Sequence, residues 1–339
     1  MARKGKWLEN VAPDQPVSVA ACMAIEERLG VVWQHAPKAA EAPEEDIEHV
    51  HQLRVATRRS VAALKAFHQL LPDKRTRKMT KLLKRVRRAA GDARDLDVLQ
   101  SRLQKHMEQR PAESLQKLLS MVAELRCQAQ EPLKKAFRRL KRKDFPQRSE
   151  KFVSRVKWRG EGGEPDFATA ARDLLRPVID EFFTAAAADL SDIEALHRMR
   201  INGKRLRYAM ELVAAAFDPS FRKELYPTFS EVQEKLGTIN DHATALAMYA
   251  VWLEQVPDAV VRDELQTLLD DEQAQLAQDA DRFRQWWTAE RSQDLKQRFD
   301  AFVGQRVTSD PGQSDPESAD ASSQYGPSSP VSAADIPSG

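Results

Sequence analysis

Cysteine and glycine are both scarce in this sequence of 339 residues, which holds 2 cysteines and 12 glycines. Cys22 and Cys127 could pair with each other, but two cysteines are too few for a disulfide framework or a cysteine-rich metal site. We therefore expect two free thiols. Because glycine is scarce and no stretch alternates apolar and polar residues for long, the composition favours helices over sheets. The sequence predicts an all-α protein.

Long apolar runs are also missing. No run approaches the roughly 20 residues that a membrane-spanning helix needs. The N-terminal segment has no clean hydrophobic signal core and carries Pro13 and Pro16. We therefore expect a cytoplasmic protein with no membrane partner. The length leaves room for two domains or for one large helical domain.

Motifs of known catalytic and cofactor sites are absent from the sequence. There is no glycine-rich phosphate loop, no nucleophile elbow and no HExxH. Asp95 and Asp97 resemble half of a metal site, but no nearby His, Cys or Glu completes a ligand set, so we interpret them as helix-capping residues. Asn240 and Asp241 receive the same interpretation. The sequence predicts no catalytic residues, no metal and no cofactor.

Charge is distributed unevenly along the chain. Residues 1–160 hold 36 Lys and Arg against 19 Asp and Glu, whereas residues 161–339 hold 17 against 32. Within 50–160 the imbalance rises to 31 against 10. A half this basic needs a polyanionic partner, an acidic face elsewhere in the protein, or both.

Breaks at proline and glycine divide the chain into two similar halves. Residues 1–15 are expected to form a flexible arm, and residues 306–339, rich in Ser, Pro, Asp and Gly, a disordered tail. Between them we expect one domain over 16–305, with a linker at about 146–165. Helices are predicted in repeat one (about 16–145) over 17–34, 47–71, 75–90, 95–109 and 112–142. Helices are predicted in repeat two (about 166–305) over 166–187, 192–216, 221–236, 241–255 and 258–303.

The two halves align without gaps at an offset of 146 residues. This offset relates His51 to His197, Arg54 to Arg200, Arg58 to Lys204, Arg59 to Arg205, Gly91 to Gly237, and Asp95 to Asp241. An ungapped register over more than 40 residues indicates an internal duplication. We expect two helical bundles that pack face to face.

Each half contains a helix with a basic face opposite an apolar face. The basic face in the first half consists of His51, Arg54, Arg58 and Lys65. The basic face in the second half consists of His197, Arg200 and Lys204, with Arg207 at its edge. Most basic helix faces are simply solvated. Two observations favour a binding face: repeat one has no acids at the i+4 positions that would pair these bases, and the pattern recurs in repeat two.

The helix predicted over 75–90 adds Lys81, Lys84, Arg85 and Arg88 beside an apolar line. If it packs beside the helix over 47–71, both basic faces could border one groove. Like charges repel by roughly 1 kcal/mol per pair at 4 Å in water, and by more at lower dielectric. A linear chain of phosphates would offset this repulsion, because Arg and Lys donate charged hydrogen bonds to phosphate oxygens.

These segments resemble the CHAD family, the conserved-histidine α-helical domain. The resemblance lies in "HQLRVATRR" with "GDARDLDVL" and in "HRMRINGKRLRY" with "LGTINDHATAL", and it covers about residues 17–303. It implies two pseudo-symmetric four-helix bundles with a basic channel between them that binds inorganic polyphosphate. Some members of the family sit on polyphosphate granules.

The resemblance also implies the binding residues. By position they are His51, Arg54, Arg58, Arg59, Lys65, Lys81, Lys84, Arg85, Arg88, His197, Arg200, Lys204 and Arg207. Where the family often has a further arginine this chain has Val61, and Lys65, one turn on, is a candidate replacement. The second helix of repeat two offers only Lys235, so we expect a channel that is stronger on the side of repeat one.

The sequence leaves three possible functions to be tested. The first is non-enzymatic binding of inorganic polyphosphate. The alternative is nonspecific binding of nucleic acid, to which the basic segment 134–143, "KKAFRRLKRK", would contribute through phosphate contacts. The third is a polyphosphate hydrolase or kinase, against which the lack of a carboxylate cluster argues. The oligomeric state stays open.

Overall fold

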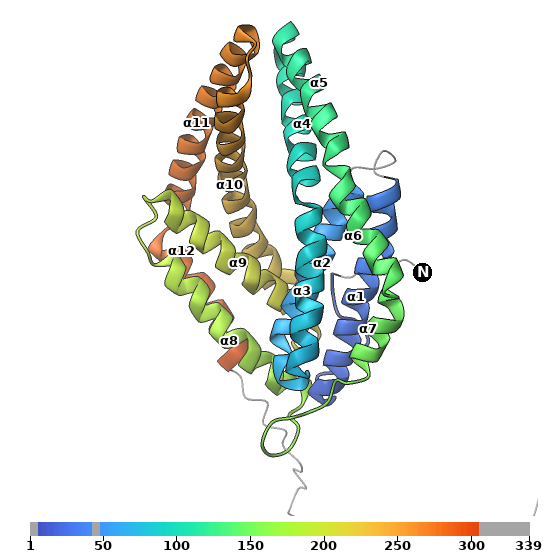
Figure 1. Cartoon of the computed structure of the whole chain (residues 1–339). Helices are drawn as coiled ribbons and strands as arrows, with labels where there is room; N and C mark the ends of the chain where they lie inside the picture. The colour runs from blue at the N-terminus through green and yellow to red at the C-terminus, as the bar shows by residue number, and fades with distance from the viewer. Residues whose placement is uncertain (1–5, 43–47, 305–339) are drawn as a thin grey trace, which may run out of the picture. The chain divides into compact units, whose positions relative to one another are not determined.

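The chain is helical throughout the part described by the structure, a computed structural model covering residues 6–42 and 48–304 (Figure 1). The first half contains α1 (Val17–Glu41), α2 (Glu48–Ala66), η1 (His68–Leu70), α3 (Asp73–Ala89), α4 (Gly91–Gln109), α5 (Glu113–Gln128), α6 (Gln130–Arg142) and α7 (Phe145–Val153). The second half contains α8 (Phe167–Ala186), α9 (Ile193–Val213), η2 (Ala214–Ala216), η3 (Phe221–Leu225), α10 (Tyr226–Gln255), α11 (Ala259–Trp286) and α12 (Ala289–Gly304). Among these residues no β-strand occurs, so the prediction of an all-α protein is confirmed.

Aspartate side chains begin several of the helices. Asp166 accepts a hydrogen bond from the backbone N–H of Thr169 at 2.7 Å, and Asp192 caps α9 in the same way. Asp258 accepts from two backbone N–H groups at the start of α11. Each cap satisfies a donor that the first helical turn leaves without a partner, and so fixes where the helix begins.

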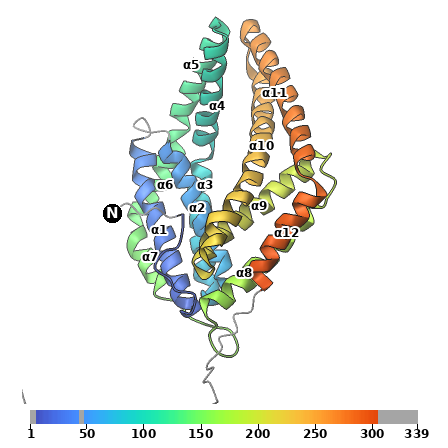
Figure 2. The same ribbon diagram turned by 180° about the vertical axis from the view of Figure 1, so that it is seen from behind.

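Two antiparallel helical hairpins extend from the rest of the fold. One consists of α4 and α5 and the other of α10 and α11; both views show them rising beside each other (Figures 1 and 2). The two hairpins meet through a small hydrophobic core that is separate from the main core. This small core includes Leu103, Leu118, Tyr249, Leu265 and Leu268. The α4 and α10 helices therefore face each other from opposite halves of the chain.

Helices α2 and α9 contact each other at the base of the two hairpins. On α2 the predicted apolar face is buried, with Leu53 and Leu64 fully inside the main core. On α9 the same holds for Met199 and Leu206. Because the apolar faces point into the core, the opposite, basic faces of both helices turn toward the space between α4 and α10.

Several predicted boundaries differ from the structure. Helix α1 continues through Pro37 to Glu41, because the buried residues Ala36, Ala39 and Ala40 hold that segment against the core. Helix α10 continues through Gly237, where a β-carbon would meet nothing within 4 Å, so this glycine makes no turn. The helix predicted over 258–303 is two helices, α11 and α12, separated at the buried Trp287.

The linker and the arm also differ from the prediction. The segment 146–165 begins with most of α7, which buries Phe145 and Phe152. In the predicted flexible arm, residues 6–15 lie against the helices: Leu8 and Val11 are buried, and the ring of Trp7 packs edge-on against that of Tyr226 at 4.6 Å. Residues 1–5 and the predicted disordered tail 306–339 lie outside the described residues.

Candidate functional site

A cavity of about 930 Å³ lies among α2, α4, α9 and α10, and both repeats contribute basic side chains to it. The lining includes seven of the predicted binding residues: His51, Arg54, Arg58, His197, Arg200, Lys204 and Arg207. The two histidines at the 146-residue offset therefore border the same cavity. Three further cations, Lys6, Arg94 and Arg102, line it as well.

Arg54 is held in place by the turn between α3 and α4. Its Nη1 atom donates to the carbonyl oxygen of Ala90 at 3.0 Å, and its Nη2 atom lies 3.6 Å from a carboxylate oxygen of Asp95. A β-carbon at Gly91 would lie 3.3 Å from Nη1, so glycine lets the guanidinium approach the backbone closely. The "GDARD" motif thus positions Arg54.

The predicted capping role of two aspartates is therefore wrong. Asp95 lies within α4 and orients Arg54, while Asp97 is buried and forms an ion pair with Arg126. Their counterparts Asn240 and Asp241 lie in the middle of α10. Asp95 and Asp97 each contact an arginine of another helix, and the local sequence does not show which residues these partners are.

His197 is oriented by α10. Its Nδ1 atom lies 3.0 Å from Oδ1 of Asn240, and since that oxygen can only accept, Nδ1 carries the proton. The side-chain amide of Asn240 in turn donates to Thr244. The contact with Asn240 therefore fixes the orientation of the His197 ring, which lines the cavity.

Three cations that line the cavity have no carboxylate within ion-pair distance in the described structure. Within the described residues no carboxylate lies within 4.0 Å of Arg58, Arg200 or Lys204. Burial, followed by the charges of Arg200 and Arg58, lowers the pKa of the Lys204 ammonium to about 7. Burial also lowers the pKa of Arg54 and of Arg200. The cavity therefore holds positive charge that a bound anion would stabilise.

His51 and Arg207 lie at the edges of this group. Burial, followed by the nearby Arg94, lowers the pKa of the His51 imidazole. Burial alone would lower the pKa of Arg207, but Glu211, 3.8 Å away, and two tyrosine hydroxyls raise it. Among the cavity cations of repeat two in the described structure, Arg207 alone has a carboxylate within 4.0 Å.

Arg59 does not line the cavity. Its Nε and Nη2 atoms donate to the two carboxylate oxygens of Glu211 at 2.7 and 3.1 Å, and Tyr226 donates to the same carboxylate at 2.7 Å. Glu211 is fully buried. The expectation that Arg59 faces the groove is therefore wrong: it neutralises a buried acid and joins α2 to α9.

The other predicted residues lie elsewhere. Lys65 and Val61 both line a second cavity and not the first, so neither position contributes a base to the first cavity. The basic side chains of α3 are exposed and do not border the cavity, because Met79, Leu83 and Val86 turn the apolar side of α3 inward. This set consists of Lys81, Lys84, Arg85 and Arg88.

Three cations of the cavity were not predicted from the sequence. Arg94 lies in the "GDARD" motif, three residues after Gly91, and Arg102 lies two helical turns beyond Asp95. The spacing of two helical turns puts Arg102 on the same face of α4 as Asp95, and this spacing could have been read from the sequence. Lys6 offered none, because nothing local indicates where the N-terminal segment packs.

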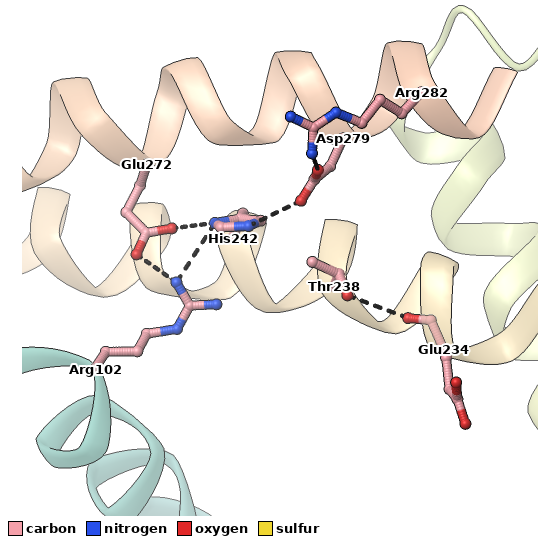
Figure 3. Close-up of polar contacts among 7 residues, drawn as sticks. All are labelled: Arg102, Glu234, Thr238, His242, Glu272, Asp279 and Arg282. Carbon is pink, nitrogen blue, oxygen red and sulfur yellow. Dashed lines mark hydrogen bonds and ion pairs between the residues drawn. The ribbon is translucent and has the colours of Figure 1, made fainter. Parts of the chain in front are cut away.

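A network of ion pairs joins the two hairpins beside the cavity (Figure 3). Glu272 of α11 pairs with Arg102 of α4 and with Nδ1 of His242, whose Nε2 atom lies 3.2 Å from Asp279. Farther along, the buried Glu264 accepts from Ser114 at 2.7 Å. These contacts join repeat one to repeat two.

Comparison with known proteins agrees with this architecture. The family model of the CHAD domain matches residues 23–250. The chain belongs to the CHAD family. The resemblance inferred from the paired motifs is thus confirmed, and the matched part of this CHAD protein contains both histidines. No curated protein matches the chain.

Two solved structures share the fold of this CHAD protein. The crystal structure of the CHAD domain from the plant Ricinus communis aligns with a TM-score of 0.67 at 23% identity, covering 84% of this chain and 96% of the other. PptA from Streptomyces chartreusis aligns with a TM-score of 0.58 at 18% identity, covering 80% and 99%. At these identities the likeness establishes the fold alone.

Two expectations about composition can be compared with the structure. Cys22 and Cys127 are both free thiols, as predicted. Among the described helices, none combines the length and apolar character needed to cross a bilayer.

Proposed function

We propose that this CHAD protein binds inorganic polyphosphate in the cavity among α2, α4, α9 and α10, without turning it over. The observation that carries the proposal is the set of partly buried cations without close carboxylates, among them Arg58, Arg200 and Lys204, which both repeats bring to one cavity. Two pseudo-symmetric bundles with a basic channel between them, which the CHAD family resemblance implies, would suit this function.

The chemistry of the lining suits a chain of phosphates. Arg54 and Arg200 present forked donors, Lys204 presents a compact charge, and His51 and His197 present imidazole rings that can donate an N–H group. A neutral or short ligand would leave part of this charge unpaired, whereas a linear polyanion can contact cations along the whole cavity. Hydrogen bonds to charged groups contribute about 1.5–3 kcal/mol each, so several such contacts give tight binding.

Calorimetry separates this proposal from nonspecific anion binding. Long-chain polyphosphate and duplex DNA are titrated at matched phosphate concentration and matched salt. We expect polyphosphate to bind more tightly, with an affinity that increases with chain length and decreases with salt. Stronger binding to DNA would contradict the proposal.

Absence of turnover is tested separately. The protein is incubated with polyphosphate and magnesium, and orthophosphate is measured over time. We expect no release above the rate without protein. Steady release that a cavity variant such as Arg200→Ala abolishes would show a hydrolase instead.

A second candidate, nucleic-acid binding, rests on the exposed basic residues of α3 and α6. These helices contact each other, and Arg139, together with Arg85 and other neighbours, lowers the pKa of Lys143, which shows that the charges gather on one surface. Replacing Arg85 and Arg142 by Ala should weaken DNA binding and leave polyphosphate binding unchanged. If both ligands weaken equally, the outer surface and the cavity are one site.

The cellular location follows from the same proposal. A polyphosphate-binding protein in the cytoplasm would collect on polyphosphate granules. A fluorescently tagged chain should overlap with a granule stain, and Arg200→Ala should reduce the overlap. Even distribution of the tagged protein in granule-containing cells would contradict the granule location.

A further inference from the structure

A second cavity, of about 660 Å³, lies among α2, α8 and α9. Its walls are mainly apolar, and include the partly buried residues Val61, Ala62, Leu174 and Val178. The volume falls in the range of about 300–1,000 Å³ that is typical of small-molecule sites. Apolar walls that the fold leaves open to water favour a ligand that brings apolar surface of its own.

Cations also line this cavity. Arg58 and Lys204 line it as well as the first cavity, so these two side chains stand between the two spaces. Arg87 of α3 lines the second cavity only. Burial, followed by the charge of Arg58, lowers the pKa of Arg87, in agreement with two guanidinium groups close together.

These three cations have no close counter-charge. Within residues 6–42 and 48–304, none of Arg58, Arg87 and Lys204 has a carboxylate within 4.0 Å. The acidic residues of this cavity are occupied or exposed: Glu181 pairs with Arg205, and Asp173 is exposed. The cavity thus combines an apolar wall with unneutralised positive charge.

We propose that the second cavity binds an amphipathic anion, a small molecule with an alkyl or acyl chain and a terminal carboxylate or phosphate. The chain lies against Val61, Ala62, Leu174 and Val178, and the head lies on Arg58, Arg87 and Lys204. Charge complementarity favours this occupant over a purely apolar one, because a neutral apolar ligand would leave three cations desolvated beside it.

The shared cations link the two cavities. An anionic head on Arg58 and Lys204 neutralises charge that the first cavity would offer to polyphosphate. The amphiphile should therefore weaken polyphosphate binding, and polyphosphate should weaken amphiphile binding by the same factor. This consequence, unlike the binding of the amphiphile itself, rests on the proposed function.

The test is calorimetry of the full chain with decanoate, decyl phosphate and decyltrimethylammonium below their micellar concentrations. We expect saturable 1:1 binding of at least one anion and binding of the cation weaker by about tenfold or more, as expected when a charged contact is lost. Val178→Trp should abolish binding by filling the cavity. Thr184→Trp, on the exposed side of α8, is the matched control and should have no effect.

A charge variant gives an independent readout if the tryptophan variant fails to fold. Arg87→Gln should weaken the anions by about tenfold, as expected when one charged hydrogen bond is lost, while Arg88→Gln on the adjacent exposed position should leave them unchanged. Arg87 does not line the first cavity, so polyphosphate binding serves as the internal control. Loss of amphiphile binding with retained polyphosphate binding distinguishes this site from the proposed function.

Four results would overturn the proposal. They are no saturable binding of either anion, equal binding of the decyl cation, binding that is unchanged in both Val178→Trp and Arg87→Gln, and binding to anionic phospholipid vesicles without binding to the free anions. Sedimentation gives a further test: a dimer that Val178→Trp dissociates would identify a second copy of the chain as the occupant instead.

Discussion

Lys204 should take up a proton when polyphosphate binds, because its ammonium group has lost most of its charge in the free protein at slightly alkaline pH. Burial and the charges of Arg200 and Arg58 lower its pKa to about 7 in the ligand-free cavity. A phosphate chain brings opposite charge next to the nitrogen and raises the pKa again. Binding and protonation of Lys204 are therefore linked.

The size of the effect follows from that pKa. At pH 8 a group with a pKa of about 7 is protonated roughly a tenth of the time. If bound phosphate keeps Lys204 charged, binding takes up about 0.9 proton at that pH. Affinity should be greatest below pH 7 and fall by at most about tenfold per unit as the pH rises above it.

The assay is calorimetry in two buffers that differ in ionisation enthalpy. Proton uptake is obtained from the difference between the observed binding enthalpies. Lys204→Arg is the matched variant, since arginine keeps its charge at every accessible pH. It should bind polyphosphate with undiminished affinity at pH 8 and take up about 0.9 proton less than the original chain, so the difference between the two chains isolates the contribution of Lys204.

Two outcomes would refute this reasoning. In the first, proton uptake at pH 8 is the same for Lys204→Arg as for the original chain. In the second, Lys204→Met, which removes the charge, binds polyphosphate as tightly below pH 7 as the original chain does. Either result would mean that the ammonium group does not contact the ligand.

Three further predictions concern the protein without ligand. Lys204→Met should raise the free energy of unfolding in urea, most strongly below pH 7 and less as the pH rises toward the ordinary lysine value of 10.5, because a charged Lys204 is disfavoured only in the fold; a gain that grows with pH would contradict this. Glu211→Gln should lower the free energy of unfolding by about 3–5 kcal/mol, since it leaves the partly buried Arg59 without its counter-charge, and an unchanged urea midpoint would be the opposite result. Glu272→Gln should accelerate amide hydrogen exchange where α4 meets α11, whereas Asp270→Asn on the same helix should not.

The basic faces of α2 and α9 could be predicted because they depend on helical periodicity and on the 146-residue repeat. Both properties can be read directly from residue spacing, without knowing how distant parts of the chain pack. Once Leu53 and Leu206 are buried, the side chains at His51 and His197 must lie on the other side of their helices. The cavity they share then follows from the contact between α2 and α9.

The remaining site residues depend on long-range packing that no local pattern encodes. Arg59 is on the helix that carries the basic face, but its partner Glu211 lies 152 residues away. The bases of α3 were predicted to border the groove from their number, whereas the rotation of α3 about its axis is set by its contacts with α2 and α6. Lys6 reaches the cavity through a segment without regular structure.

Helix boundaries were predicted least well at proline and glycine. Relative to alanine, proline inside a helix is less favourable by about 3 kcal/mol and glycine by about 1 kcal/mol. Burial of the neighbouring alanines outweighs this cost at Pro37, and the long packed surface of α10 does so at Gly237. Tertiary contacts decided both positions, so sequence alone pointed to a break at each.

The central claim is that cations from both repeats contact one polyanion. Its most direct test is calorimetric titration of long-chain polyphosphate into Arg54→Ala and Arg200→Ala, with the exposed Arg198→Ala as control and folding checked by circular dichroism. We expect unchanged stoichiometry and a loss of about ten- to a hundredfold in affinity for each cavity variant, with no loss for the control. If one of the two cavity variants binds like the original chain, or if each removes one of two independent sites, the two repeats do not share a ligand.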